Sequence, residues 1–219
     1  MDAALRLIKR GQTAEARQRL EPVVASHPGW GRAHFYLALT YHEEQRYAEA
    51  EGLFRRALEL DPEYAPPRVF FGWCLYYLGK LPEARKMFES YRTTAPEYAD
   101  AHYALGLIDF DEDNLESAST RFLQTIELAQ KQHLPPTESK ARARLADVMI
   151  RSGDLQHAKE ELLRSIALNP DNYETYFKLS RVLQRLGDAA GAEKARNDYE
   201  EAFRRSRAKS PPSEPGKKP

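Results

Sequence analysis

The stretch Ala57-Leu58-Glu59-Leu60-Asp61-Pro62 recurs later in the chain as Ser165-Ile166-Ala167-Leu168-Asn169-Pro170. Moving 34 residues back from Pro62 reaches Pro28, and moving 34 residues forward reaches Pro96. Proline ends a helix because it has no amide hydrogen to continue the hydrogen-bond ladder. The 219-residue chain is therefore predicted to consist of 34-residue repeats, several of them closed by a proline.

Each predicted repeat has the spacing of two helices joined by a short turn. In four repeats an alanine is followed four residues later by a large apolar residue, and these pairs are Ala50 and Phe54, Ala84 and Phe88, Ala118 and Phe122, and Ala158 and Leu162. Glycine stands where the first helix would end, at Gly79, Gly153 and Gly187, because a left-handed residue costs glycine least. Small residues permit close helix approach, so we expect each repeat to bury its apolar face against its neighbours.

This pattern resembles the tetratricopeptide repeat (TPR), W-x2-L-G-x2-Y…A-x3-F…P. The resemblance covers nearly the whole chain in about six repeats, at 1–30, 31–64, 65–98, 99–132, 139–172 and 173–206, with an insertion at 133–138. It implies an all-α fold, a right-handed α-solenoid of helix-turn-helix units. It also implies that the first helices of successive repeats line a concave groove that receives partners.

Two repeats depart from the pattern. Gln130 stands where the fourth repeat should have its proline, so the second helix there is predicted to be longer and to end at Pro135 and Pro136. The sixth repeat has Arg196 where a large apolar residue should pack, and its second helix is polar enough to act as a solvating cap. Residues 207–219 are expected to form a disordered tail.

The composition is that of a globular protein without excess charge, because 33 Lys and Arg balance 33 Asp and Glu. Zero net charge argues against a dedicated polyanion binder. No apolar run is long enough to span a bilayer, and the N-terminal residues lack the apolar core of a signal peptide. The single cysteine, Cys74, cannot form an intrachain disulfide, which favours a cytoplasmic location.

The sequence contains no arrangement typical of an active site or a metal site. His42-Glu43-Glu44 lacks the second histidine that a zinc helix needs four residues after the first. The acidic run at 109–113 lacks the glycine and glutamate of a calcium loop. Cys74 has no histidine or cationic neighbour in sequence to activate it. We therefore expect no catalytic residues, no metal and no cofactor, and interpret the chain as non-enzymatic.

The predicted groove follows one face of successive first helices, and its character changes along the chain. Its first part is mainly aromatic and apolar, comprising Phe35, Tyr36, Leu39, His42, Phe70, Trp73, Tyr76, Tyr77, Tyr103, Leu107 and Phe110. Its second part is basic, comprising Arg144, Arg151, Lys178, Arg181 and Arg185. The charge follows the same division, because residues 1–139 carry 16 basic and 21 acidic groups, whereas residues 140–219 carry 17 and 12.

This groove predicts a protein-interaction scaffold or adaptor whose partner peptide or helix has apolar or aromatic anchors followed by acidic residues. The Lys and Asn positions of the clamp with which some TPR proteins hold chaperone tails carry other residues here, so we do not expect that activity. Two alternatives stay open. One is an RNA-binding accessory role for the basic repeats, and the other is self-association through an incompletely capped first repeat. The truncated first repeat also allows the chain to be part of a longer array.

Overall fold

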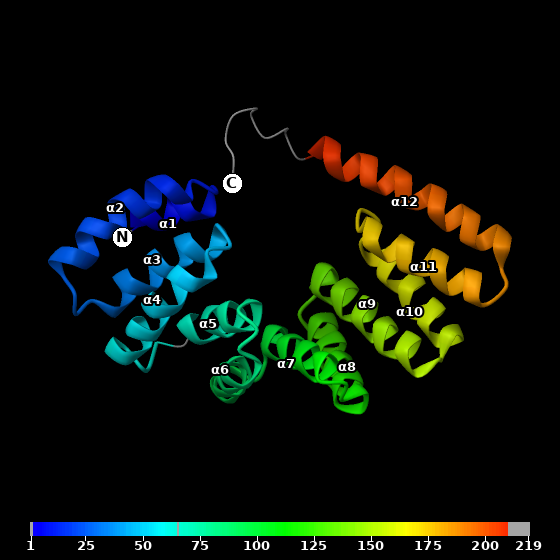
Figure 1. Cartoon of the computed structure of the whole chain (residues 1–219), viewed down its shortest axis with the longest axis horizontal. Coiled ribbons are helices and arrows are strands. Elements are labelled where there is room, and N and C mark those ends of the chain that lie inside the picture. The colour runs from blue at the N-terminus through cyan, green and yellow to red at the C-terminus, as the bar shows by residue number, and fades with distance from the viewer. Residues whose placement is uncertain (1, 65, 210–219) are drawn as a thin grey trace. The chain divides into compact units, whose positions relative to one another are not determined.

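The computed structural model describes residues 2–64 and 66–209, and this part of the chain contains α-helices and no strand (Figure 1). In chain order the helices are α1 (Asp2–Lys9), α2 (Thr13–Ser26), α3 (Gly31–Glu43), α4 (Tyr47–Leu60), α5 (Pro66–Tyr77), α6 (Leu81–Thr94), α7 (Ala99–Asp111), α8 (Leu115–Lys131), α9 (Pro135–Ser152), α10 (Leu155–Leu168), α11 (Tyr173–Arg185) and α12 (Ala189–Lys209). The predicted all-α class is confirmed. Each repeat holds two helices, an odd-numbered first helix and an even-numbered second helix.

The chain forms two compact units, which we call the N-terminal unit (Met1–Ile108) and the C-terminal unit (Asp109–Pro219). The N-terminal unit contains α1 to α6 and most of α7, and the C-terminal unit contains α8 to α12. Within each unit a helix packs mainly against its neighbours in sequence. Such local contacts are what a stack of repeats requires, because each repeat buries its apolar face against the next.

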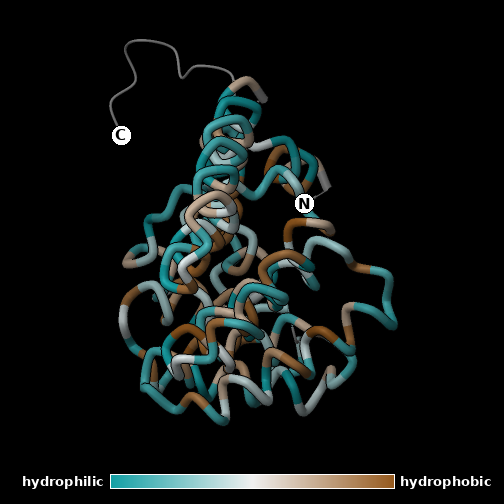
Figure 2. Tube along the Cα trace, turned by 90° about the vertical axis from the view of Figure 1, so that its right-hand side faces the viewer, coloured by the Kyte–Doolittle hydropathy of each residue, from teal (hydrophilic) through white to brown (hydrophobic). Residues whose placement is uncertain are grey.

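Small and large apolar residues alternate through both cores as the repeat predicts. In the N-terminal unit Ala50, Phe54, Ala84 and Phe88 are fully buried, and in the C-terminal unit Ala158 and Leu162 are fully buried. Hydrophobic and hydrophilic residues alternate along the helices accordingly (Figure 2). The cores are therefore built on the residues that define the repeat.

The turns within repeats use left-handed residues. Gly79, Gly153 and Gly187 follow the first helices α5, α9 and α11 with φ of 73°, 84° and 81°. Residues other than glycine are strained at these positive φ angles. These three glycines thus end the helices where the sequence predicted.

The prediction for the fourth repeat was wrong in its end point. Helix α8 has 17 residues against 14 in α10, but it ends at Lys131, and His133 then turns the chain with a φ of 56°. Pro135 and Pro136 begin α9 instead of ending α8. Proline is well tolerated in the first helical turn, because the amide hydrogens there have no intrahelical acceptor. The insertion therefore lengthens α9, which has 18 residues.

The last helix also differs from its prediction. Residues 207–209, expected to belong to the tail, are the last residues of α12. The rest of the predicted tail, 210–219, lies outside the described residues. Arg196 is exposed, whereas Phe54, at the equivalent place in the second repeat, is fully buried. No helix among the described residues is long and apolar enough to cross a membrane.

Candidate functional site

The predicted aromatic face of the N-terminal unit is centred on the second half of α5. The ring of Tyr77 stacks on that of Tyr47 from α4, with centroids 4.7 Å apart, and Trp73 lies 6.1 Å from Tyr77. Tyr76 meets Trp73 edge-on at 5.8 Å. On its other side Trp73 packs against the fully buried Phe88 at 5.3 Å. Tyr77 is 54% exposed, so this stack begins in the core and ends at the surface.

Three residues of the predicted groove belong instead to the core. Phe35 is 3% exposed, and Leu39 and Leu107 are each 7% exposed. Phe35 is covered by the rings of Phe54, Tyr64 and Phe70 at 5.6 to 6.1 Å. These three side chains offer almost no area to a partner, because neighbouring helices already occupy the face on which they lie. Tyr36, Phe70, Tyr76, Tyr103 and Phe110 are half-buried and border the remaining surface.

His42 is an aromatic filler next to this surface. Its ring meets Tyr47 at 5.4 Å, Phe70 at 6.0 Å and Phe54 at 6.2 Å, each edge-on. Both ring nitrogens are buried and have no hydrogen-bond partner among the described residues. Burial lowers the pKa of His42, and the nearby Glu43 carboxylate only partly opposes this effect. The ring is therefore neutral at pH 7, and its environment is that of a packed aromatic group.

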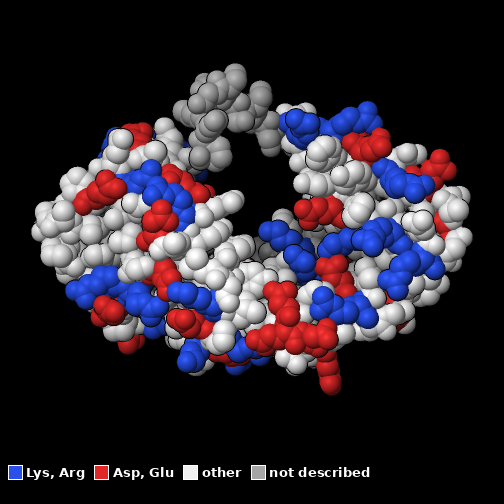
Figure 3. All heavy atoms as spheres, viewed as in Figure 1, with Lys and Arg blue, Asp and Glu red and all other residues white. Residues whose placement is uncertain are grey.

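The basic face of the C-terminal unit is largely neutralised by its own acidic residues. Asp147 of α9 accepts from Lys178 Nζ at 2.6 Å and from Arg144 Nη1 at 3.2 Å. Arg151 lies over the Phe110 ring, 4.0 Å from its centroid, and donates to Asp113 at 3.2 Å. Positive and negative side chains are accordingly intermixed on the face shown in Figure 3. Sequence reasoning treated these cations as available and missed their ion pairs.

Two of the predicted basic residues remain available. Arg181 and Arg185 of α11 are exposed and have no ion-pair partner among the residues that the structure describes. The guanidinium carbon of Arg181 lies 5.9 Å from the centroid of the Phe177 ring. Phe177 precedes Arg181 by about one helical turn. These two guanidinium groups are therefore accessible positive charges on this face.

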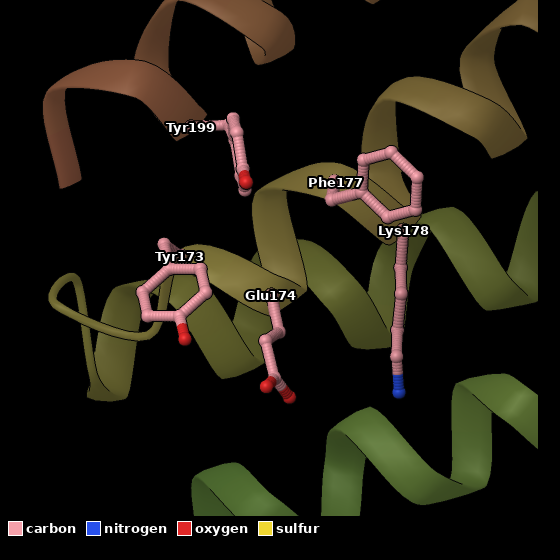
Figure 4. Close-up of a pocket in the computed structure, with 5 residues that line it drawn as sticks. All are labelled: Tyr173, Glu174, Phe177, Lys178 and Tyr199. Carbon is pink, nitrogen blue, oxygen red and sulfur yellow. The ribbon is translucent and has the colours of Figure 1, made fainter. Parts of the chain in front are cut away.

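A cleft of about 310 Å³ lies between α11 and α12 in the C-terminal unit. Its walls are Tyr173, Glu174, Phe177, Lys178 and Tyr199. Figure 4 shows Tyr199 reaching from α12 toward the rings of Tyr173 and Phe177 on α11. The ring centroids of Phe177 and Tyr199 are 6.0 Å apart, and those of Tyr173 and Tyr199 are 5.9 Å apart.

Of the cleft residues, sequence reasoning placed Phe177 and Lys178 on the groove face of the last repeat and did not name the other three as site residues. Tyr173 and Tyr199 could have been found by comparing the repeats, because the fifth repeat has Ser139 and Ser165 at the same two places. An exchange of two small residues for two large aromatic ones indicates that the last repeat is built differently at this point.

The described residues offer no arrangement for metal or nucleophilic chemistry. They contain no group of three or more His, Cys, Asp or Glu side chains placed to hold a metal ion. Cys74 is fully buried and its thiol donates to the carbonyl oxygen of Tyr47. Burial raises the pKa of Cys74 to about 12, so the thiol stays protonated and unreactive at neutral pH.

Comparison with family models decides the family of the chain. Tetratricopeptide-repeat models match residues 1–65, 41–106, 139–172 and 161–194. The chain belongs to the tetratricopeptide-repeat family. TPR proteins generally serve as non-enzymatic scaffolds for protein–protein interaction, and their repeats form extended binding surfaces.

The relatives of this TPR chain are distant and longer. It is 27% identical over 191 residues to the CTR9 homolog of Arabidopsis thaliana, covering 83% of this chain and 17% of that protein. It is 27% identical over 166 residues to DnaJ homolog subfamily C member 7 of Homo sapiens, covering 70% of this chain and 34% of that protein. The chain therefore spans about a third or less of the length of these relatives.

Solved structures with the same fold include two of broad overlap. The structure of the APC/C hetero-tetramer Cut9-Hcn1 matches 97% of this chain and 40% of its own with a TM-score of 0.79 and 16% identity. PilF of Pseudomonas aeruginosa matches 95% of each chain with a TM-score of 0.75 and 19% identity. YrrB, a TPR protein described as having an unusual peptide-binding site, matches 84% of this chain and 91% of its own with a TM-score of 0.60 and 16% identity. These likenesses confirm the α-solenoid fold class.

Proposed function

We propose that this TPR chain is a non-enzymatic interaction scaffold whose N-terminal unit binds apolar or aromatic side chains of a protein partner. The observation that carries the proposal is the stack of Tyr47, Tyr77 and Trp73, which continues from the core to a half-exposed tyrosine. Tyrosine and tryptophan are the residues most often responsible for binding energy at protein interfaces, each contributing about 2 kcal/mol or more when a partner buries it.

The stack is also held in place before a partner arrives. Tyr77 is fixed by Tyr47 and Trp73, and Trp73 is fixed by Phe88. A side chain that is already ordered loses little conformational entropy on binding, which would otherwise cost about 0.5–1.5 kcal/mol for each immobilised side chain. This preorganisation supports a binding role for Tyr77, the exposed end of the stack.

The alternative of RNA binding gains nothing from the charge arrangement. Phosphate contacts need available cations, and Arg144, Arg151 and Lys178 all donate to carboxylates of the C-terminal unit. We therefore retain the protein partner. We also propose a cytoplasmic location, because the single cysteine, Cys74, is buried and forms no disulfide.

The test is a partner capture with matched variants. Tyr77→Ala removes the exposed end of the stack, and Tyr98→Ala removes a comparably exposed ring (49%) outside it. Both chains, with the wild type, are used to capture proteins from lysate for quantitative mass spectrometry. The amount of each captured partner should fall at least about fivefold with Tyr77→Ala and stay at the wild-type level with Tyr98→Ala. Equal capture by the wild type and Tyr77→Ala would reject the site.

A further inference from the structure

Phe35 of α3 and Phe177 of α11 occupy the same place in their repeats, but their surroundings differ. Phe35 is 3% exposed because Tyr64, at the end of its own repeat, and Phe70, in the next repeat, cover it at 5.6 and 5.8 Å. Phe177 is 50% exposed; Tyr199 of α12 lies beside it at 6.0 Å, and no helix follows α12 among the described residues. The Phe177 ring therefore has contacts within its own repeat and, in the described part of the chain, none of the kind that Phe70 of the next repeat makes with Phe35.

The same end of the last repeat is opened by two tyrosines. In the second repeat the two helices lie close together at Gly31 and Ala57, where a Cβ on Gly31 would lie 3.1 Å from the Ala57 carbonyl oxygen. Tyr173 and Tyr199 stand at these places in the last repeat, with ring centroids 5.9 Å apart. Two rings need more room than a glycine and an alanine, so a cleft lies at this point between α11 and α12 (Figure 4).

The cleft fits one side chain better than a small ligand. Its volume of about 310 Å³ is at the lower end of the range of small-molecule sites, which is about 300–1,000 Å³. Three of its five lining residues are aromatic, and the Tyr199 ring lies against the rings of Tyr173 and Phe177. An inserted ring would meet Phe177 much as Phe70 meets Phe35.

The charge beside the cleft selects the rest of the partner. Tyr173, Phe177, Arg181 and Arg185 follow one another every fourth residue and share one face of α11. This face is aromatic in its first half and basic in its second, and the two arginines have no ion-pair partner among the described residues. It favours a segment with an aromatic residue followed or preceded by acidic residues within about two helical turns.

The outer part of the same end surface is polar. Glu51 and Arg55 of α4 contact the following repeat, through Lys80 at 2.7 Å and the Phe71 ring at 5.5 Å. Their equivalents on α12 are Glu193 and Asn197, which are polar and exposed. A single helix lying against the α11 side would cover the apolar part of this surface and leave the polar part in water.

We propose that the end surface of the C-terminal unit is a second docking site, which accepts a partner helix carrying one aromatic side chain and acidic residues one and two turns away. The aromatic ring enters the cleft beside Phe177 and Tyr199, and the carboxylates pair with Arg181 and Arg185. This site is separate from the aromatic stack of the N-terminal unit, so each proposal stands or fails by itself.

The probe is a display library of synthetic helices of about 18 residues, randomised at four positions on one face and selected on the full 219-residue chain. Selected helices should carry Phe, Tyr or Trp at one position and Asp or Glu one and two turns away, in one direction along the helix. Affinities are then measured by fluorescence anisotropy. Binding should weaken by about tenfold on Phe177→Ala, and a selection on Arg181→Glu with Arg185→Glu should favour basic instead of acidic residues.

Matched measurements separate the possible outcomes. Tyr77→Ala should leave the affinity of the selected helices unchanged, since it alters only the N-terminal unit. Phe177 is 50% exposed and Arg181 is exposed. Circular dichroism should therefore show an unchanged fold in their variants. Selected helices without an aromatic residue, or with equal affinity for Phe177→Ala, would overturn the proposal. A wild-type dimer that Phe177→Ala converts to a monomer would also overturn it, because a second copy would then be the occupant.

Discussion

Ser139 of α9 and Ser165 of α10 exchange hydrogen bonds between the two helices. Each hydroxyl donates to the other residue's backbone carbonyl oxygen at 2.9 Å, and the two hydroxyl oxygens are 3.0 Å apart. Both side chains are fully buried. In the fifth repeat this pair joins the two helices by hydrogen bonds. In the sixth repeat Tyr173 and Tyr199 stand at the same two positions and line a cleft instead.

The first prediction concerns this serine pair. Ser165→Ala removes one hydroxyl, its hydrogen bond to the Ser139 carbonyl and its contact with the Ser139 hydroxyl. We expect the free energy of unfolding to fall by about 1–2 kcal/mol, since buried groups lose partners that water cannot replace. The measurement is urea unfolding followed by circular dichroism. Ser117→Ala, an exposed serine on α8, is the control and should change stability by less than about 0.5 kcal/mol. Equal midpoints for the two variants would show that the exchange adds no stability.

A second prediction sets two glycines of the N-terminal unit against each other. A Cβ on Gly72 would lie 2.7 to 2.9 Å from three ring atoms of Phe88, which is fully buried. A Cβ on Gly52 would meet nothing within 4 Å, and Gly52 lies inside α4. Gly72→Ala should therefore lower the free energy of unfolding by about 1–3 kcal/mol through overpacking. Gly52→Ala should raise it by about 0.5–1 kcal/mol, because alanine is the better helix former.

Both glycine variants are measured by thermal and urea unfolding with tryptophan fluorescence. Trp30 and Trp73 are the only tryptophans in the sequence, and both lie in the N-terminal unit, so the signal reports on the unit that carries the changes. A shift of the same sign for the two variants would contradict the assignment of Gly72 to a close contact with Phe88.

Much of the fold could be predicted from the sequence because each repeat packs its helices through residues of the same type at the same positions. The buried pairs of Ala50 with Phe54 and Ala84 with Phe88 are fixed by local helix geometry, and the turn at Gly79 is fixed by backbone sterics. The end of α8 could not be predicted in the same way. Two consecutive prolines are compatible with the end of one helix and with the start of the next. In the structure His133, with its positive φ, turns the chain after α8, and the two prolines begin α9.

The surface was harder to predict than the core, for two physical reasons. A position on the inner face can be covered by the next repeat, as Phe35 is, or left open, as Phe177 is, although the residue is the same. A charge can also be satisfied by a residue one repeat away, as Lys178 is by Asp147 at 2.6 Å. Both effects depend on contacts between repeats, and periodicity within a repeat does not contain them.

A third prediction follows from the buried ring of His42. Its folded-state pKa is lowered by burial below the ordinary value of 6.5, so the unfolded chain takes up a proton first as the pH falls. The stability that depends on a neutral His42 is therefore fully present above pH 6.5 and is lost as the pH falls from there toward the folded-state pKa. His42→Phe keeps an aromatic ring against Tyr47, Phe54 and Phe70 and removes the titrating group.

We expect His42→Phe to unfold at higher urea concentration than the wild type at about pH 5.5, with a smaller difference at about pH 7.5. Tryptophan fluorescence again reports on the N-terminal unit. His27→Phe changes an exposed ring in the same unit and should retain the wild-type dependence on pH. Parallel pH profiles for His42→Phe and the wild type would show that the ring does not titrate with folding.

The last prediction concerns a buried ion-pair group in the C-terminal unit. Arg142 donates to Glu138 and to Glu161, each at 2.7 Å, and Glu161 also accepts from Arg164. The Arg142 side chain is 13% exposed and that of Glu161 is 9% exposed. Arg142→Met leaves the two carboxylates without their shared partner, and we expect it to lower the free energy of unfolding by about 3–5 kcal/mol.

The double variant Arg142→Met with Glu161→Met should recover most of that loss, because it removes the poorly solvated charge together with its partner and fills the space with apolar atoms. The two single variants and the double variant form a thermodynamic cycle, measured by urea unfolding with circular dichroism. Arg56→Met breaks an exposed pair with Glu59 at 3.0 Å and should cost at most about 1 kcal/mol. If the losses of the single variants simply add in the double variant, Arg142 and Glu161 are not coupled. The cost of Arg142→Met would then arise from lost packing of its aliphatic stem.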